Sequence, residues 1–183
     1  MAYPIVPSRV FLTKGAGKHK EKLQSFELAL RSAGIAQCNL VRVSSIFPPG
    51  CNLIRREEGL QYIQAGQILF SVLCSNSTNE PNRLIAASVG LAIPQDRTMY
   101  GYLSEHASFG QTSGRAGDYA EDLAATMLAT TLGIQFNVDD SYDEKKKQWR
   151  ISGKIVKTTN VAQSMEGDKN GLWTTAVAAA AFI

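Results

Sequence analysis

The chain has 183 residues, 44% of them hydrophobic and 19% charged, which suits a single globular domain with a buried core. No apolar run reaches the roughly 20 residues that a membrane-spanning helix needs, and prolines and Arg9 interrupt any signal-peptide core, so a cytoplasmic protein without membrane contact is expected. The formal net charge is only +3 and the lysine clusters are interleaved with acids, so no nucleic-acid partner is expected.

The beginning of the chain predicts a strand followed by a helix. Residues 9–15 (RVFLTKG) have the pattern of a strand that leaves through glycines, and GAGK (15–18) lacks the spacing of a phosphate-binding loop, so it predicts a turn. Residues 20–34 place apolar side chains at helical spacing, with Gly34 as the expected C-cap. The predicted apolar stripe consists of Leu23, Phe26, Leu30 and Ala33, with Glu27 one step from it.

Residues 38–46 (CNLVRVSSI) predict a second strand, because their side chains alternate in character. Leu40 lies on one face of this strand, and Val41 and Val43 lie on the other. The Pro-Pro-Gly sequence at 48–50 ends it. The strand therefore carries two adjacent serines just before its end.

The middle of the chain predicts a helical turn and three strands. A short helix or turn is expected after Glu57, and a buried strand is expected at Ile68–Cys74. Residues 82–94 are apolar throughout, which fits either helix or strand, and the stretch before Pro94 favours a strand. An aromatic-rich strand is predicted at 98–106.

The last third predicts one long helix and two strands. The helix covers 117–134, and Gly133 is expected to stop it. Its predicted apolar face consists of Tyr119, Leu123, Met127 and Leu128. Strands are predicted at 147–159 and, as a buried end of the chain, at 171–183. Together these elements predict one α/β or α+β domain with a large sheet or two stacked sheets.

Several kinds of chemistry are excluded by what the sequence lacks. The cysteines, Cys38, Cys51 and Cys74, are odd in number and scattered, which indicates reduced thiols. His19 and His106 have no partner at metal-ligand spacing, so no metal is expected. No G-x-S-x-G motif surrounds a serine and no GxGxxG follows a strand, so neither a serine hydrolase nor a dinucleotide site is expected.

The pair Ser44–Ser45 allows a different reaction. A serine hydroxyl can attack the preceding peptide carbonyl, and the resulting ester can be eliminated to cut the chain and leave a pyruvoyl group. This needs a peptide bond that is held in reach of the hydroxyl and a hydrogen-bond donor for the oxyanion. Val43 and the following prolines restrict the chain on both sides, and the Asn39 amide is one candidate donor. Taken alone, a Ser-Ser dipeptide is too common to decide between two hypotheses, a self-cleaving bond and an ordinary strand that ends in a turn.

The surrounding sequence resembles the pyruvoyl-dependent arginine decarboxylases. Residues 39–49 match that family's Asn-Leu-(Val/Ile)-x-(Val/Ile)-Ser-Ser-Ile-x-Pro-Pro pattern throughout. Residues 86–106 resemble the family's Ala-Ile-Pro-x-Asp segment and the strand that ends in its catalytic glutamate, which is Glu105 here. The alanine-rich end at 171–183 is also similar to the family's closing strand.

The resemblance implies a self-made cofactor. Cleavage between Ser44 and Ser45 would give a β chain of residues 1–44 and an α chain of residues 45–183, with Ser45 becoming a covalent pyruvoyl group. This group takes up electrons while CO₂ leaves, the role that pyridoxal phosphate has in other decarboxylases. Glu105 would be the general acid that protonates the product carbanion, and Asn39 would assist processing and positioning.

The resemblance also implies a fold and an assembly. The family has a four-layer αββα sandwich, and its copies form trimers, or higher multiples, with active sites between subunits. Glu27 lies where relatives have an aspartate that reaches a neighbouring subunit's site, so it is the expected partner of the arginine guanidinium. Glutamate is one methylene longer, so its reach differs.

The function expected from the sequence is therefore decarboxylation of L-arginine to agmatine and CO₂. Two alternatives stay open. One is a pyruvoyl enzyme acting on another amino acid, such as ornithine, lysine or aspartate. The other is an oligomeric protein of the same fold that never cuts itself.

Overall fold

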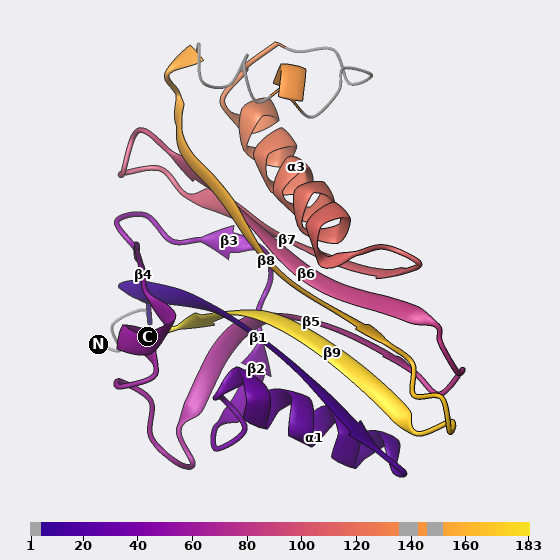
Figure 1. Cartoon of the computed structure of the whole chain (residues 1–183). Helices are drawn as coiled ribbons and strands as arrows, with labels where there is room; N and C mark the ends of the chain where they lie inside the picture. The colour runs from indigo at the N-terminus through magenta and orange to yellow at the C-terminus, as the bar shows by residue number, and fades with distance from the viewer. Residues whose placement is uncertain (1–4, 136–142, 146–151) are drawn as a thin grey trace.

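The computed structural model describes residues 5–135, 143–145 and 152–183, and these form two stacked sheets between two long helices (Figure 1). The strands are β1 (Arg9–His19), β2 (Asn39–Arg42), β3 (Ile46–Phe47), β4 (Asn52–Ile54), β5 (Ile68–Thr78), β6 (Leu84–Pro94), β7 (Gly101–Phe109), β8 (Ile155–Glu166) and β9 (Trp173–Phe182). The helices are α1 (Lys22–Ala33), α2 (Arg56–Gly59) and α3 (Ser113–Thr131). The described helices include none that is long and apolar enough to cross a membrane.

The two sheets differ in their strand pairing. The five-stranded sheet has the order β2-β5-β9-β1-β4, with β2–β5 and β1–β4 parallel and its other pairs antiparallel. The four-stranded sheet has the order β3-β7-β6-β8 and is antiparallel throughout. The chain crosses repeatedly from one sheet to the other, so each sheet combines strands from separate parts of the chain.

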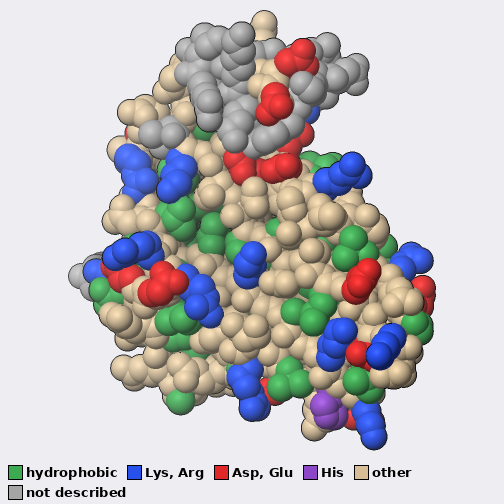
Figure 2. Space-filling model, in the orientation of Figure 1, with side chains coloured by type: hydrophobic (Ala, Val, Ile, Leu, Met, Phe, Trp, Pro, Cys, Tyr) green, Lys and Arg blue, Asp and Glu red, His purple; other side chains and the backbone are tan. Residues whose placement is uncertain are grey.

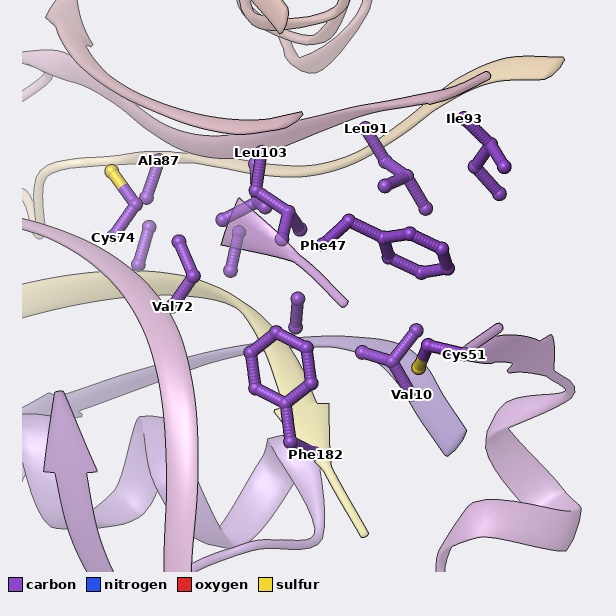
Figure 3. Packing of buried hydrophobic residues seen from close by; sticks show 14 of the residues in the cluster. Val10, Phe47, Cys51, Val72, Cys74, Ala87, Leu91, Ile93, Leu103 and Phe182 are labelled. Carbon is purple, nitrogen blue, oxygen red and sulfur yellow. The ribbon is translucent and has the colours of Figure 1, made fainter. Parts of the chain in front are cut away.

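Three hydrophobic clusters fill the three spaces between the four layers. The largest lies between the sheets and contains Phe47, Leu91, Leu103 and Phe182 (Figure 3). A second joins α1 to the five-stranded sheet, and a third joins α3 to the four-stranded sheet. This arrangement confirms the expected four-layer αββα sandwich.

Two glycines of β1 allow helix α1 to lie close against the five-stranded sheet. A Cβ on Gly15 would come within 2.2 Å of the Ala29 carbonyl oxygen, and one on Gly17 would come within 2.4 Å of the Ser25 oxygen. The predicted strand at 9–15 was too short, and the turn predicted at 15–18 is not formed, because β1 continues through the GAGK residues to His19. The small residues Ser25, Ala29 and Ala33 pack here with Leu30, while Leu23, placed in the predicted stripe, is 77% exposed. Gly34 is the left-handed C-cap, as predicted.

Helix α3 also packs through small side chains. Its buried positions are mostly alanines, and the predicted face was only partly right, because Leu128 is buried whereas Tyr119 is 49% exposed. The helix begins at Ser113, four residues before the predicted start, where the Thr112 side chain caps it. Close approach to β6 explains the choice of alanine, since Gly90 leaves no room for a Cβ beneath the helix.

Replacing Gly90 by alanine is expected to destabilise the domain. The new methyl would lie 2.1 Å from the Ala120 carbonyl oxygen, and both backbones would have to shift, at a cost of about 1–3 kcal/mol. Gly114→Ala is the matched control, because the only neighbouring atom lies 3.9 Å away and alanine favours helix by about 1 kcal/mol. Urea unfolding of the two variants measures the difference. An equal midpoint for both would contradict the close packing at Gly90.

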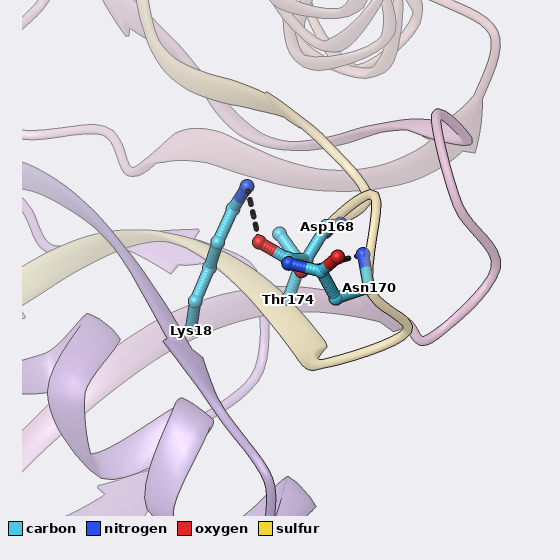
Figure 4. A network of polar contacts seen from close by, with 4 residues as sticks. All are labelled: Lys18, Asp168, Asn170 and Thr174. Carbon is cyan, nitrogen blue, oxygen red and sulfur yellow. Dashed lines mark hydrogen bonds and ion pairs between the residues drawn. The ribbon is translucent and has the colours of Figure 1, made fainter.

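Two lysines of β1 contact β8 and the turn that follows it rather than forming a basic surface. Lys18 Nζ lies 3.5 Å from Asp168 Oδ2, in the turn between β8 and β9 (Figure 4). The hydrogen bond from the Asn170 N–H lowers the pKa of Asp168, and the charge of Lys18 lowers it further. The Asp168 N–H in turn donates to Thr174 Oγ1. Lys14 Nζ donates to a backbone oxygen of β8. On the face shown in Figure 2, basic side chains are spread out and not gathered into one patch.

The remaining predicted elements are found with shifted ends. The ambiguous segment 82–94 forms strand β6, and the predicted strands at 68–74, 98–106 and 171–183 correspond to β5, β7 and β9. The helical turn expected after Glu57 is α2. The strand predicted at 147–159 overlaps β8, which starts only at Ile155, and residues 147–151 of that prediction lie outside the described residues.

Candidate active site

The serine pair lies where the chain crosses from one sheet to the other. The continuous strand predicted for 38–46 is wrong, because β2 ends at Arg42 in the five-stranded sheet and β3 begins at Ile46 in the four-stranded sheet. The side-chain alternation was correct for Leu40, which packs towards α1, and for Val43, which packs between the sheets. The three residues 43–45 bridge the two sheets.

Hydrogen bonds fix this bridge at both ends. The Val43 N–H donates to the Ser71 oxygen of β5 at 3.1 Å, and the Ser45 oxygen accepts from the Leu103 N–H of β7 at 2.7 Å. Phe47, just beyond, is buried in the core between the sheets. The Ser44–Ser45 bond is therefore held between two anchors that belong to different sheets.

The bridge contains a tight turn. The Ile46 N–H donates to the Ser44 oxygen at 2.9 Å, which closes a three-residue turn centred on Ser45. Ser44 is exposed and Ser45 is half-buried. Self-cleavage would require a bend at this position, and the chain bends here. The Ile46 N–H already donates to the Ser44 carbonyl oxygen.

Glu105 lies on the strand that anchors Ser45. It follows Leu103 by two residues on β7, so its backbone is about 7 Å further along the strand. Its side chain projects from the same face as that of Leu103, which is the face towards the core between the sheets. Glu105 is exposed in the single chain, but partial desolvation raises its pKa, and the charge of Arg42 partly opposes this rise. The strand pairing therefore brings Ser45 and Glu105 together although 60 positions separate them in the sequence.

Arg42 is a charged residue acting on Glu105 that the sequence patterns did not identify. Its guanidinium donates to Ser75 Oγ at 3.4 Å, and its charge acts on both Glu105 and the Cys74 thiol. Burial is the main cause that raises the pKa of Cys74, and the charge of Glu105 adds to it. The available signal was that Arg42 is the one charged residue in the run 39–47.

An apolar pocket of about 530 Å³ adjoins the bridge. Ser44 and Ile46 line it together with Phe70 and Phe182, and none of its lining side chains is charged. A cationic group would find no partner there. The charged groups of the candidate site, Glu105 and Arg42, therefore lie outside this pocket.

Asn39 and Glu27 are not brought to the serine pair of the same chain. Asn39 is the first residue of β2, and extended chain separates it from Val43 by about 13 Å. Its side-chain amide donates to the Gly66 oxygen at 2.9 Å. Glu27 lies on α1, on the outer face of the five-stranded sheet, where its carboxylate accepts from Arg31 at 2.7 Å. Within one chain, the site thus consists of Ser44, Ser45, Glu105 and Arg42.

Comparisons with known proteins cover this site and the whole fold. The model of a family described as pyruvoyl-dependent arginine decarboxylase matches residues 9–183. A protein of Chloroherpeton thalassium, named a probable pyruvoyl-dependent arginine decarboxylase, is 62% identical over 175 residues, or 96% of each chain. The pyruvoyl-dependent arginine decarboxylase of Nitrosopumilus maritimus is 58% identical over 179 residues, or 98% of each chain. That of Methanococcoides burtonii is 52% identical over 98% of this chain and 99% of its own.

Proposed function

Because the chain belongs to the pyruvoyl-dependent arginine decarboxylase family, we propose that it cuts itself between Ser44 and Ser45 and then converts L-arginine to agmatine and CO₂. The observation that carries this proposal is the position of the serine pair, held between two sheets and next to Glu105. The sequence resemblance and the site geometry thus point to the same bond.

The residues around Ser45 suit a pyruvoyl group at this position. After cleavage, residue 45 would begin the α chain, and its carbonyl would still be anchored by the Leu103 N–H of β7. Val43 and Ser44 would stay with the five-stranded sheet, so the new chain ends can separate without disturbing either sheet. The pyruvoyl group supplies an electron-accepting carbonyl for the departure of CO₂. Glu105 would stay on the same strand as this anchor.

Glu105 is proposed to hold the proton that the product carbon receives. A free glutamic acid is almost fully ionised at neutral pH, so a proton donor needs a raised pKa. Partial desolvation raises the pKa of Glu105, which is the required direction, and the charge of Arg42 limits the rise. Arg42 therefore has the role of setting how much of Glu105 is protonated at the working pH.

The pH dependence of turnover tests this pair. We expect kcat to fall as the pH rises through the raised pKa of Glu105, because the donor then loses its proton. Arg42→Met removes a positive charge that stabilises the carboxylate, so the fall should move to higher pH. Arg115→Met, at the exposed start of α3, is the control and should leave the profile unchanged. A profile that moves to lower pH in Arg42→Met would contradict the assignment.

We further propose that the active unit is a homotrimer or a higher multiple of it. Strand β3 pairs only with Tyr102 and Gly101, so in the described part of the chain Glu105–Phe109 have no strand partner on that side. Phe109 and Ile46 expose much of their apolar surface along the same edge. Open edges of this kind are normally covered, and a second copy would cover this one and enclose the site.

A neighbouring copy would also explain how Glu27 takes part. If Glu27 of one subunit receives the arginine guanidinium in the site of the next, Glu27→Ala should raise KM for arginine about 10- to 100-fold, the cost of a lost charged hydrogen bond. The cleavage at Ser44 should be unaffected. Glu57→Ala, which removes an exposed glutamate of α2, is the matched control. An unchanged KM in Glu27→Ala would remove this residue from the substrate site.

Two measurements test the proposed function. Intact mass should show two fragments in place of one chain of 19.9 kDa, with the larger fragment blocked by a ketone. Release of CO₂ from a panel of amino acids should then be greatest with arginine. A folded chain that is never cut would favour the non-catalytic alternative, and release from ornithine, lysine or aspartate would favour another pyruvoyl enzyme.

A further inference from the structure

The backbone N–H of Ile46 is directed at the carbonyl of the bond that the proposed function cuts. Three backbone N–H groups make hydrogen bonds around the serine pair. That of Val43 is used by the Ser71 oxygen, and that of Leu103 by the Ser45 oxygen. The third, that of Ile46, donates to the Ser44 oxygen at 2.9 Å. Of these three groups, only that of Ile46 contacts the carbonyl between Ser44 and Ser45.

This contact lies where charge would develop during cleavage. When the Ser45 hydroxyl adds to the Ser44 carbonyl carbon, the carbonyl oxygen gains negative charge, and a donor within hydrogen-bond distance stabilises it. The Asn39 amide, the candidate from the sequence, is instead bound to the Gly66 oxygen at the opposite end of β2. The tight turn at Ser45 supplies a donor from the backbone itself.

We infer that the Ile46 N–H is the oxyanion donor of the self-cleavage reaction. This inference rests on the proposed function, since it concerns the step that makes the pyruvoyl group. It adds a catalytic group that no sequence pattern could identify, because a backbone N–H is common to nearly all residues and only the turn directs it. The anchors on Val43 and Ser45 keep the turn closed while the bond is attacked.

The reaction that this donor assists is balanced as follows. The Ser45 oxygen forms a bond to the Ser44 carbonyl carbon, the C–N bond breaks, and the hydroxyl proton goes to the Ser45 nitrogen, so an ester replaces the amide. Loss of the Ser45 Cα proton and of the Ser44 carboxylate then leaves dehydroalanine. Its imine tautomer takes up one water and releases ammonia, which leaves the pyruvoyl group. The Ile46 N–H acts on the first step and is not consumed.

An amide-to-ester exchange tests the inference. Cell-free synthesis with the α-hydroxy analogue of isoleucine at position 46 removes this N–H and keeps the side chain. We expect the Ser44–Ser45 bond of this chain to be cut about 10²- to 10³-fold more slowly, the usual effect of losing one oxyanion donor. The matched control places the α-hydroxy analogue of phenylalanine at Phe47, which also removes an N–H from β3 but not the one on the Ser44 carbonyl.

Intact mass separates the outcomes. Cleavage at Ser44–Ser45 gives fragments 1–44 and 45–183, whereas hydrolysis of the inserted ester would give 1–45 and 46–183. Equal cleavage rates in the Ile46 ester chain and the unaltered chain would overturn the inference alone. If the unaltered chain stays uncut, the proposed self-cleavage fails, and this inference falls with it. An Ile46 ester chain that fails to fold while the Phe47 ester chain folds would also overturn it, since the N–H would then serve structure and not chemistry.

Discussion

Replacement of Ser45 by alanine is expected to give a folded chain of 19.9 kDa that is never cut and releases no CO₂ from arginine. Alanine keeps the Cβ of this half-buried residue, and its carbonyl can still accept from the Leu103 N–H. What is lost is the hydroxyl, and with it the atom that attacks the Ser44 carbonyl. Without the attack no pyruvoyl group forms, so cleavage and turnover should both fall below detection.

Ser44→Ala is the matched control for this variant. Ser44 contributes only its carbonyl to the reaction, and this carbonyl is retained in alanine together with its hydrogen bond from Ile46. Cleavage should therefore slow by no more than about tenfold, or about 1.4 kcal/mol in the barrier. Intact mass over time gives both rates. Two fragments from Ser45→Ala, or complete loss of cleavage in Ser44→Ala only, would reverse the roles assigned to the two serines.

Glu105→Gln is expected to separate cleavage from turnover. Glutamine keeps the size and hydrogen-bonding capacity of the side chain but cannot deliver a proton to carbon, and general acids contribute about 10²- to 10⁴-fold to such steps. We therefore expect two fragments in the normal ratio and a kcat lower by about this factor. Glu80→Gln, at an exposed turn where Glu80 pairs with Arg83, is the control and should keep full activity. Full activity in Glu105→Gln would remove Glu105 from the reaction.

The same variant has a second effect that depends on pH. Because the pKa of Glu105 is raised in the folded chain, the fold is penalised as the pH rises through that pKa, when the carboxyl must ionise in a partly desolvated position. Glutamine carries no charge, so Glu105→Gln should melt at a higher temperature than the parent above neutral pH. In acid, below the pKa of an unfolded glutamic acid, the two melting temperatures should converge. A lower melting temperature above neutral pH would contradict the direction of the shift.

The elements of this fold were largely predictable, and their packing faces were not. Strands β5, β6, β7 and β9 and both long helices follow from apolar patterns. The prediction placed large side chains such as Leu23 and Tyr119 on the buried faces of the helices, but these side chains are exposed. Glycines on the facing strands allow the helices to lie so close that only small residues fit between them. This distance depends on both a helix and a strand from another part of the chain, so the pattern within the helix alone does not report it.

The candidate site shows the same division between local and distant information. The contiguous pattern around Ser44 and Ser45 was enough to single out this bond and, by resemblance, to predict its chemistry, and the sequence also pointed to Glu105. Three features needed the folded chain: the break of residues 38–46 at the serines, the position of Glu105 on the strand that anchors Ser45, and the charge of Arg42 acting on Glu105. The physical reason is that periodicity reports which face of its own strand or helix a residue occupies, whereas this site forms where hydrogen bonds join strands from separate parts of the chain.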